Sequence, residues 1–230
     1  GPEKKSRVIN EEERKLTAFH EAGHAVVLRE VSTTDRVERV SIIPAGGAGG
    51  YTAFKPNEDI YFKTKSQLIA EIKMALGGRA AEDIVFGEIS TGAGADLKEI
   101  NRIARAMVTK YGMSQRLGNV VTNNDDEVFI GRDYGHVINH SDALQSAVDE
   151  EIARILEEAY ADTKDILTVN RTLLDELAAR LLEKEKVESQ EFEDIYQEFA
   201  VSPKPLPGEE AREVKLTPEE ALPSVQPMED

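Results

Sequence analysis

A chain of 230 residues with a formal net charge of −16 and no cysteine can form one substantial domain or two small ones. Because phosphate contacts require a face rich in lysine and arginine, the acidic balance argues against nucleic acid as the main partner. The absence of cysteine excludes disulfides, thiolate metal sites and cysteine nucleophiles, so any metal ion must be bound by histidine, aspartate or glutamate.

The amino-terminal part of the chain is predicted to form a helix followed by two strands. Asn10 is a suitable N-cap for a helix over residues 10–30, because three glutamates follow it in the first turn, where negative charge stabilises a helix. Residues 37–44 are rich in β-branched side chains and predict a strand. The glycine-rich residues 46–50 predict a turn, and residues 51–54 a second strand.

The middle of the chain is predicted to contain two helices and a long loop. The helices are expected over residues 65–86 and 96–111, and Gly77 and Gly78 lie inside the first of them. Two adjacent glycines cost about 1 kcal/mol each in a helix. They therefore indicate either a local break or the close approach of another backbone. The polar residues 118–140 are expected to form a surface loop.

The carboxy-terminal part is predicted to be helical and then disordered. Helices are expected over residues 141–164, 165–184 and 189–199, and prolines recur among acidic residues after Val201. The fold class expected is mainly α, with a small β-sheet near the functional site and a carboxy-terminal helical bundle.

The sequence His20-Glu21-Ala22-Gly23-His24 matches the pattern H-E-x-x-H within the first predicted helix. Since one helical turn spans about 3.6 residues, His20 and His24 project from the same face, and their imidazoles can bind one Zn²⁺. Glu21 lies about 100° around the helix, where it can reach a metal-bound water and act as the general base in peptide hydrolysis. A coincidental pair of histidines on an amphipathic helix is the alternative.

Two histidines leave a catalytic zinc ion one protein ligand short. The remaining two, His136 and His140, lie in the polar loop and are expected at the surface. A carboxylate is therefore the expected third ligand, and Glu82 and Asp96 are the candidates. Asp96 could instead cap a helix, and Glu82 could be a solvated helix residue, so spacing alone does not choose between them.

Beyond this pattern, five blocks in one order resemble the FtsH-type AAA+ metalloproteases over residues 15–199. The blocks are LTAFHEAGHAVV (16–27), VSIIPAG (40–46), GGYT (49–52), ALGGRAAEDIVFGEISTGAGADL (75–97) and ARAMVTKYGMS (104–114). The resemblance implies one zinc ion per chain.

The resemblance also assigns the site residues. It implies that His20 and His24 bind the zinc ion, that Glu21 is the catalytic glutamate and that Asp96 is the third ligand. Glu82 would support the site without being a ligand.

A substrate-binding strand is also implied by the resemblance, at Gly50, Tyr51, Thr52 and Ala53. There an extended peptide would add to the sheet edge by backbone hydrogen bonds.

The resemblance further implies a whole protein in which membrane helices and an AAA+ ATPase precede this domain in a homohexamer. Such a protein uses ATP and Mg²⁺ in its ATPase domain and degrades unfolded or damaged membrane proteins from the cytoplasmic or equivalent side of a bacterial or organelle membrane. This chain has no GxxxxGK[ST] loop and no apolar run near the ~20 residues of a membrane span, so it is expected to be a soluble fragment that does not hydrolyse ATP. A catalytically silent oligomerisation module and a stand-alone peptidase are the alternatives.

The opening Gly1-Pro2 resembles the remnant of a removed tag. Four segments are expected: a flexible amino terminus (1–9), a zinc peptidase core (10–140), a helical region of the same domain (141–200) and a disordered, acidic, proline-rich tail (201–230).

Overall fold

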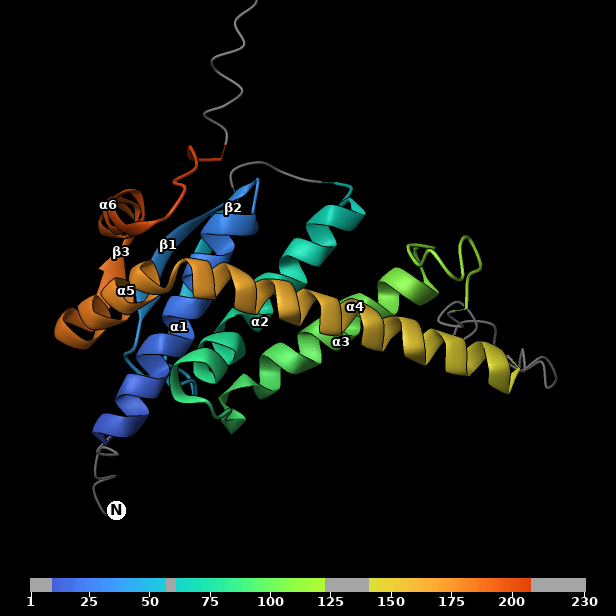
Figure 1. Ribbon diagram of the computed structural model, residues 1–230, viewed down its shortest axis with the longest axis horizontal. Coiled ribbons are helices and arrows are strands. Elements are labelled where there is room, and N and C mark those ends of the chain that lie inside the picture. Colours follow the sequence, from blue (N-terminus) through green and yellow to red (C-terminus); the bar gives the residue numbers. More distant parts are fainter. Residues whose placement is uncertain (1–9, 57–60, 123–140, 208–230) are drawn as a thin grey trace, which may run out of the picture.

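The computed structural model describes residues 10–56, 61–122 and 141–207. Helices dominate this part of the chain and one small sheet accompanies them, which confirms the mainly α class (Figure 1). The elements are α1 (Glu11–Val31), β1 (Asp35–Ser41), β2 (Tyr51–Pro56), α2 (Lys65–Phe86), the 3-10 helix η1 (Thr91–Ala93), α3 (Gly94–Thr109), α4 (Asp142–Val169), α5 (Arg171–Lys184), β3 (Lys186–Glu188) and α6 (Ser189–Phe199).

Helix α1 begins where the sequence predicts it. The Asn10 side chain accepts a hydrogen bond of 2.7 Å from the Glu13 amide, which satisfies one of the free N–H groups of the first turn. The helix packs against α2, α5 and the sheet, so most of its length is buried. Because α1 carries the H-E-x-x-H pattern, its packing against these neighbours fixes the position of the candidate site.

Helix α2 crosses α1 in backbone contact. It runs without a break through Gly77 and Gly78, so the prediction of a close backbone approach is confirmed and a local break is not observed. A Cβ atom added to Gly77 would lie 2.6 Å from the Gly23 carbonyl oxygen, and one added to Gly23 would overlap the Gly77 carbonyl oxygen. Only glycine at both positions permits this crossing.

The three strands form an antiparallel sheet in the order β2-β1-β3. Strand β1 pairs with β2 through Ser41 opposite Tyr51, and with β3 through Val40 opposite Val187. The two predicted strands are confirmed with shifted ends, whereas β3 was not predicted. Because β3 comes from the carboxy-terminal part of the chain, the sheet joins that part to the site-bearing part.

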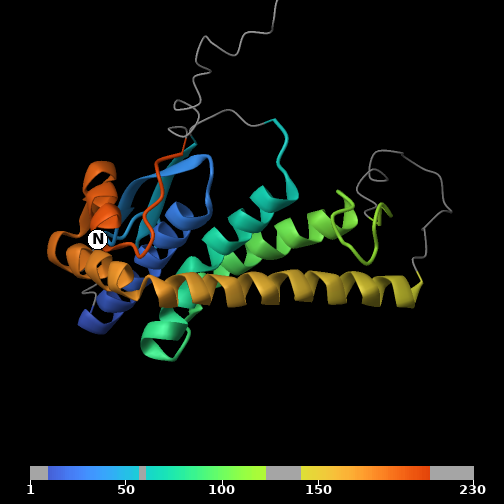
Figure 2. The same cartoon turned by 45° about the horizontal axis from the view of Figure 1, so that its top comes forward.

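Two hydrophobic clusters fill the interior. The first packs α1 and the sheet against α5 and α6, and includes Leu177 and Phe192. The second packs α2, α3 and α4 together, and includes Ile72 and Met107. Figure 2 shows α4, in yellow to orange, extending along one side of the molecule past α2 and α3.

The break between the long carboxy-terminal helices is at Asn170, so the predicted division between residues 164 and 165 is wrong. Asn170 leaves the helical conformation, its amide group donates to the Ile166 carbonyl at 3.1 Å, and its side-chain oxygen accepts from the Val201 amide at 3.2 Å. A polar residue that caps the helix end therefore sets the break.

Residues 201–207 are held against the domain, so the expectation of disorder does not hold for this segment. The Lys204 amide donates to the Tyr196 hydroxyl at 3.1 Å, and its carbonyl accepts from the buried Arg29 guanidinium at 2.6 Å. Arg29 also binds both carboxylate oxygens of Glu193, at 3.0 and 2.9 Å.

Several predicted segments lie outside the described residues. They are the amino terminus (1–9), most of the polar loop with His136 and His140 (123–140), and the rest of the tail (208–230). Within the described ranges, no helix combines the length and the apolar character needed to cross a membrane.

We predict that Gly23→Ala lowers the free energy of unfolding by about 1–3 kcal/mol or more, because the new methyl group would overlap the Gly77 backbone and lie 2.7 Å from the Ala81 Cβ. Urea denaturation followed by circular dichroism measures the change. The matched control is Gly94→Ala, since nothing lies within 4 Å of a Cβ there. It should leave stability unchanged or raise it by about 0.4–1 kcal/mol. Equal losses in both variants would refute the close helix crossing.

Candidate metal centre

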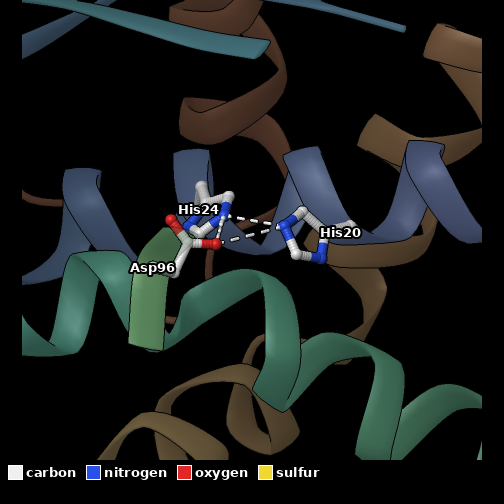
Figure 3. Close-up of side chains that lie close together, drawn as sticks. All are labelled: His20, His24 and Asp96. Carbon is white, nitrogen blue, oxygen red and sulfur yellow. Dashed lines mark hydrogen bonds and ion pairs between the residues drawn. The ribbon is translucent and has the colours of Figure 1, made fainter. Parts of the chain in front are cut away.

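Three ligand-type side chains from two helices converge on one point. His20 and His24 project from the same face of α1, and Asp96 reaches them from the first turn of α3 (Figure 3). The two Nε2 atoms are 3.0 Å apart, and Asp96 Oδ2 lies 3.5 Å from that of His20 and 3.3 Å from that of His24. These are the residues that form a potential metal-binding group in the described part of the chain.

The spacing of these atoms fits a tetrahedral metal ion. Four ligands at about 2.0–2.1 Å from a tetrahedral zinc ion lie about 3.3–3.4 Å from one another. The three observed separations, 3.0, 3.3 and 3.5 Å, bracket that value. The donor set, two imidazole nitrogens and one carboxylate oxygen, is also one that zinc accepts, and it leaves the fourth position open.

Helix α2 fixes the orientation of the His24 ring. The Nδ1 atom of His24 lies 2.8 Å from the Met74 carbonyl oxygen. Because a carbonyl can only accept, Nδ1 carries the proton and Nε2 keeps its lone pair for the metal position. A backbone atom of α2 thus sets the tautomer of a residue on α1.

Glu82 contacts the other nitrogen of His20, away from the point of convergence. Its carboxylate is fully buried, Oε2 lies 3.0 Å from His20 Nδ1, and Oε1 accepts a short hydrogen bond from the Ser90 hydroxyl. The structure therefore brings Asp96, and not Glu82, together with the two Nε2 atoms. Asp96 also does not cap α3, which begins two residues earlier with Ala93 as its N-cap.

The charges of these side chains depend on one another. Burial lowers the pKa of His20, but hydrogen bonds to Asp96 and Glu82 outweigh it and raise that pKa from 6.5 to about 9. Burial would raise the pKa of Asp96, yet its contacts with His20 and His24 hold it well below its usual range. Burial also acts to raise the pKa of Glu82, and its bonds to His20 and Ser90 lower it overall.

The converging residues border a cavity of about 1100 Å³. Glu21, which is 8% exposed, also lines this cavity, so the glutamate of the H-E-x-x-H pattern faces the same space as the two histidines. The Thr52 hydroxyl donates to Glu21 Oε2 at 2.9 Å. The sequence contains no signal for this contact, because it joins residues on different elements.

The predicted substrate strand lies along the cavity in part. Gly50, Tyr51 and Thr52 line the cavity, whereas Ala53 is not among its lining residues. Strand β2 pairs with β1 on one side only in the described sheet, so its other edge is an unpaired row of backbone groups.

Two further site partners were missed by sequence reasoning: the Met74 carbonyl and the Ser90 hydroxyl. A backbone acceptor leaves no trace in the residue type. Ser90 lies in the block STGAGAD that ends at Asp96, and that proximity is the one available signal.

Comparison with known proteins shows the family. The profile of "Peptidase family M41" matches residues 7–195. The chain belongs to this peptidase family, and the resemblance to FtsH-type metalloproteases is confirmed.

Similar proteins named ATP-dependent zinc metalloprotease FtsH occur in several bacteria. The one from Ruminiclostridium cellulolyticum is 58% identical over 198 residues, which cover 86% of this chain and 32% of that protein. The one from Veillonella parvula is 44% identical over 220 residues, which cover 95% of this chain and 34% of that protein. The chain thus spans about a third of the length of these relatives.

We predict that the stability of the metal-free protein falls as the pH rises from 6.5 to 9. A pKa raised from 6.5 to about 9 in the folded state means that protonated His20 stabilises the fold fully below pH 6.5, and that this contribution is lost as the pH passes 9. The loss should be about 3 kcal/mol, from 1.36 kcal/mol per pKa unit.

Urea denaturation in the presence of a chelator at pH 6, 7.5 and 9 measures this loss. The control is His20→Gln, in which the titrating imidazole is absent. A fall of the same size in both proteins would contradict the assigned charge on His20.

Proposed function

We propose that this chain is the zinc-dependent endopeptidase domain of an ATP-dependent protease. The observation that carries the proposal is the convergence of His20 Nε2, His24 Nε2 and Asp96 Oδ2 at separations that fit a tetrahedral ion. Membership of peptidase family M41 and the names of the relatives support it.

In this proposal the chain's own residues divide the work of hydrolysis. His20, His24 and Asp96 hold the zinc ion, which when bound supplies a Lewis acid and a water of lowered pKa. Glu21 faces the same cavity, accepts the proton of the attacking water and returns it to the leaving amine nitrogen. Glu82 keeps the proton of His20 on Nδ1 and so leaves Nε2 free to bind.

The unpaired edge of β2 is the proposed place for the substrate. An extended peptide added there would form main-chain hydrogen bonds with the strand, and its scissile bond would lie in the cavity that Glu21 lines. Backbone recognition requires an unfolded segment and depends little on its side chains. Unfolded proteins are therefore the proposed substrate class.

The larger assembly is also a proposal. The relatives are named ATP-dependent and are about three times longer than the matched region, which leaves room for an AAA+ ATPase and membrane helices in the same chain. We propose that the whole protein is a membrane-anchored homohexamer, with this domain on the cytoplasmic or equivalent side, that acts on damaged membrane proteins.

We predict that Glu21→Gln lowers the rate of casein cleavage by about 10²–10⁴-fold, because the amide cannot accept a proton. Zinc content should remain about one ion per chain, and the circular dichroism spectrum should not change. The matched control is Glu12→Gln, the same substitution at an exposed position of α1, which should cleave at the normal rate.

Two outcomes would contradict the proposal. One is full cleavage by zinc-loaded Glu21→Gln. The other is a zinc-loaded wild-type chain that does not cleave casein at all, a result that would favour the silent oligomerisation module.

We predict that Asp96→Asn weakens zinc binding more than Glu82→Gln does. The first change replaces the proposed carboxylate ligand with a neutral amide, whereas the second removes only a partner of His20 Nδ1, which typically costs 10–100-fold in metal affinity. Competition with a chromophoric chelator measures both affinities. The reverse order would assign the ligand to Glu82.

A further inference from the structure

The carboxylate of Glu21 is held by a residue of the sheet. The Thr52 hydroxyl lies 2.9 Å from Glu21 Oε2 and 3.1 Å from the Glu21 carbonyl oxygen. Both groups are acceptors, so the single proton of the hydroxyl is shared between them in a three-centre hydrogen bond. A hydrogen bond to an ionised carboxylate is about twice as strong as one between neutral groups, and the side chain of Glu21 is buried. The 2.9 Å contact is therefore the stronger restraint.

The chain at Gly50 also limits the space around the Glu21 side chain. A Cβ atom added to Gly50 would lie 3.1 Å from Glu21 Cγ and 2.6 Å from the Ser41 carbonyl oxygen. A side chain at position 50 would therefore crowd the Cγ atom of Glu21, and glycine leaves that space free. The chain at the beginning of β2 thus passes beside Glu21 at Gly50 and binds its carboxylate through Thr52.

The alternation of side chains along a strand explains why Thr52 makes this contact. Successive residues of β2 point to opposite faces of the sheet, so Thr52 points toward α1, and Tyr51 and Ala53 point away from it. The backbone of the strand is left free at its unpaired edge. One residue can therefore bind Glu21 through its side chain while the same strand presents main-chain groups to a peptide.

We propose that Thr52 is a positioning residue that holds the carboxylate of Glu21 in the orientation required for proton transfer. The inference rests on the proposed function, in which Glu21 is the general base. With Oε2 fixed by Thr52, Oε1 is the oxygen that receives the proton. Since β2 also forms the proposed substrate edge, the same strand fixes the position of the bound peptide relative to the carboxylate of Glu21. A misplacement of the base by about 1 Å relative to the peptide can reduce the rate by about 10²-fold.

A purely structural role of Thr52 predicts a different result. The bond to the Glu21 carbonyl also ties the sheet to α1, so its loss alone would lower stability without changing the turnover of the folded protein. The two roles are separated by kcat and KM, by zinc content, and by a variant that restores the hydroxyl.

The experiment compares Thr52→Val and Thr52→Ser in the zinc-loaded chain with an unfolded fluorogenic peptide. Valine keeps the shape and removes the donor, and we expect kcat to fall about 10–100-fold with KM within about twofold and one zinc ion per chain. Serine keeps the donor and should recover most of kcat. Thr168→Val is the matched control, because that exposed hydroxyl bonds only within α4, to the Lys164 carbonyl, and its loss should leave kcat unchanged.

The double variant, which lacks both the Thr52 hydroxyl and the Glu21 carboxylate, gives the decisive measurement. If Thr52 acts through Glu21, Thr52→Val should cause little further loss in the Glu21→Gln background, whereas independent effects would multiply. If Thr52→Val does not fold, Thr52→Ala removes the same donor with less steric demand, and the same loss of kcat is expected.

The outcomes distinguish this inference from the proposed function. A folded Thr52→Val protein with normal kcat overturns the positioning role, and so does a Thr52→Ser protein that is as impaired as Thr52→Val. In either case an inactive Glu21→Gln protein leaves the proposed function intact. Equal cleavage by the wild-type and Glu21→Gln proteins overturns the function itself.

Discussion

The backbone contact between α1 and α2 is the constraint on which the site depends. Glycines at positions 23 and 77 let the two helices approach until their main chains touch. Only at this separation can α2 supply the Met74 carbonyl to one histidine and the Glu82 carboxylate to the other. The glycines, although costly in a helix interior, therefore allow the contacts that orient both imidazoles. A bulkier residue at the crossing would move the Met74 carbonyl and the Glu82 carboxylate away from the two histidines.

The electrostatics of the site follow from that packing. Hydrogen bonds to two carboxylates outweigh the effect of burial and raise the pKa of His20 to about 9, so a proton supplies positive charge among these groups. The negative potential that retains this proton also favours a divalent cation among the same groups. In the proposed zinc site, metal binding releases the proton from His20, so the affinity for zinc should increase with pH over the range in which the stability measured with a chelator declines. The rise in zinc affinity and the fall in stability with pH thus have the same cause, the two carboxylates beside His20.

The sequence predicts those parts of the site that depend on local geometry. The pairing of His20 with His24 follows from helical periodicity alone, and it was predicted from the residues. Asp96 lies 72 positions beyond His24, and only the family resemblance chose it over Glu82, because no spacing rule spans so long an interval. The Met74 carbonyl was not predictable, since every residue has a carbonyl. Strand β3 was missed because three residues are too few for a periodic pattern, and its pairing with β1 comes from tertiary packing.

Strand β3 matters for the site although it lies at the far edge of the sheet. By pairing with Arg39, Val40 and Ser41 it covers the middle strand on the side opposite β2, so β1 has neighbours on both sides over this stretch. The outer edge of β3 has only three residues, which is too short to bind a peptide as an added strand. Strand β2, with six residues, presents the longer unpaired edge, and its Thr52 contacts Glu21. In the proposed function, the carboxy-terminal part of the chain thereby leaves β2 as the edge for an added strand, beside the proposed base.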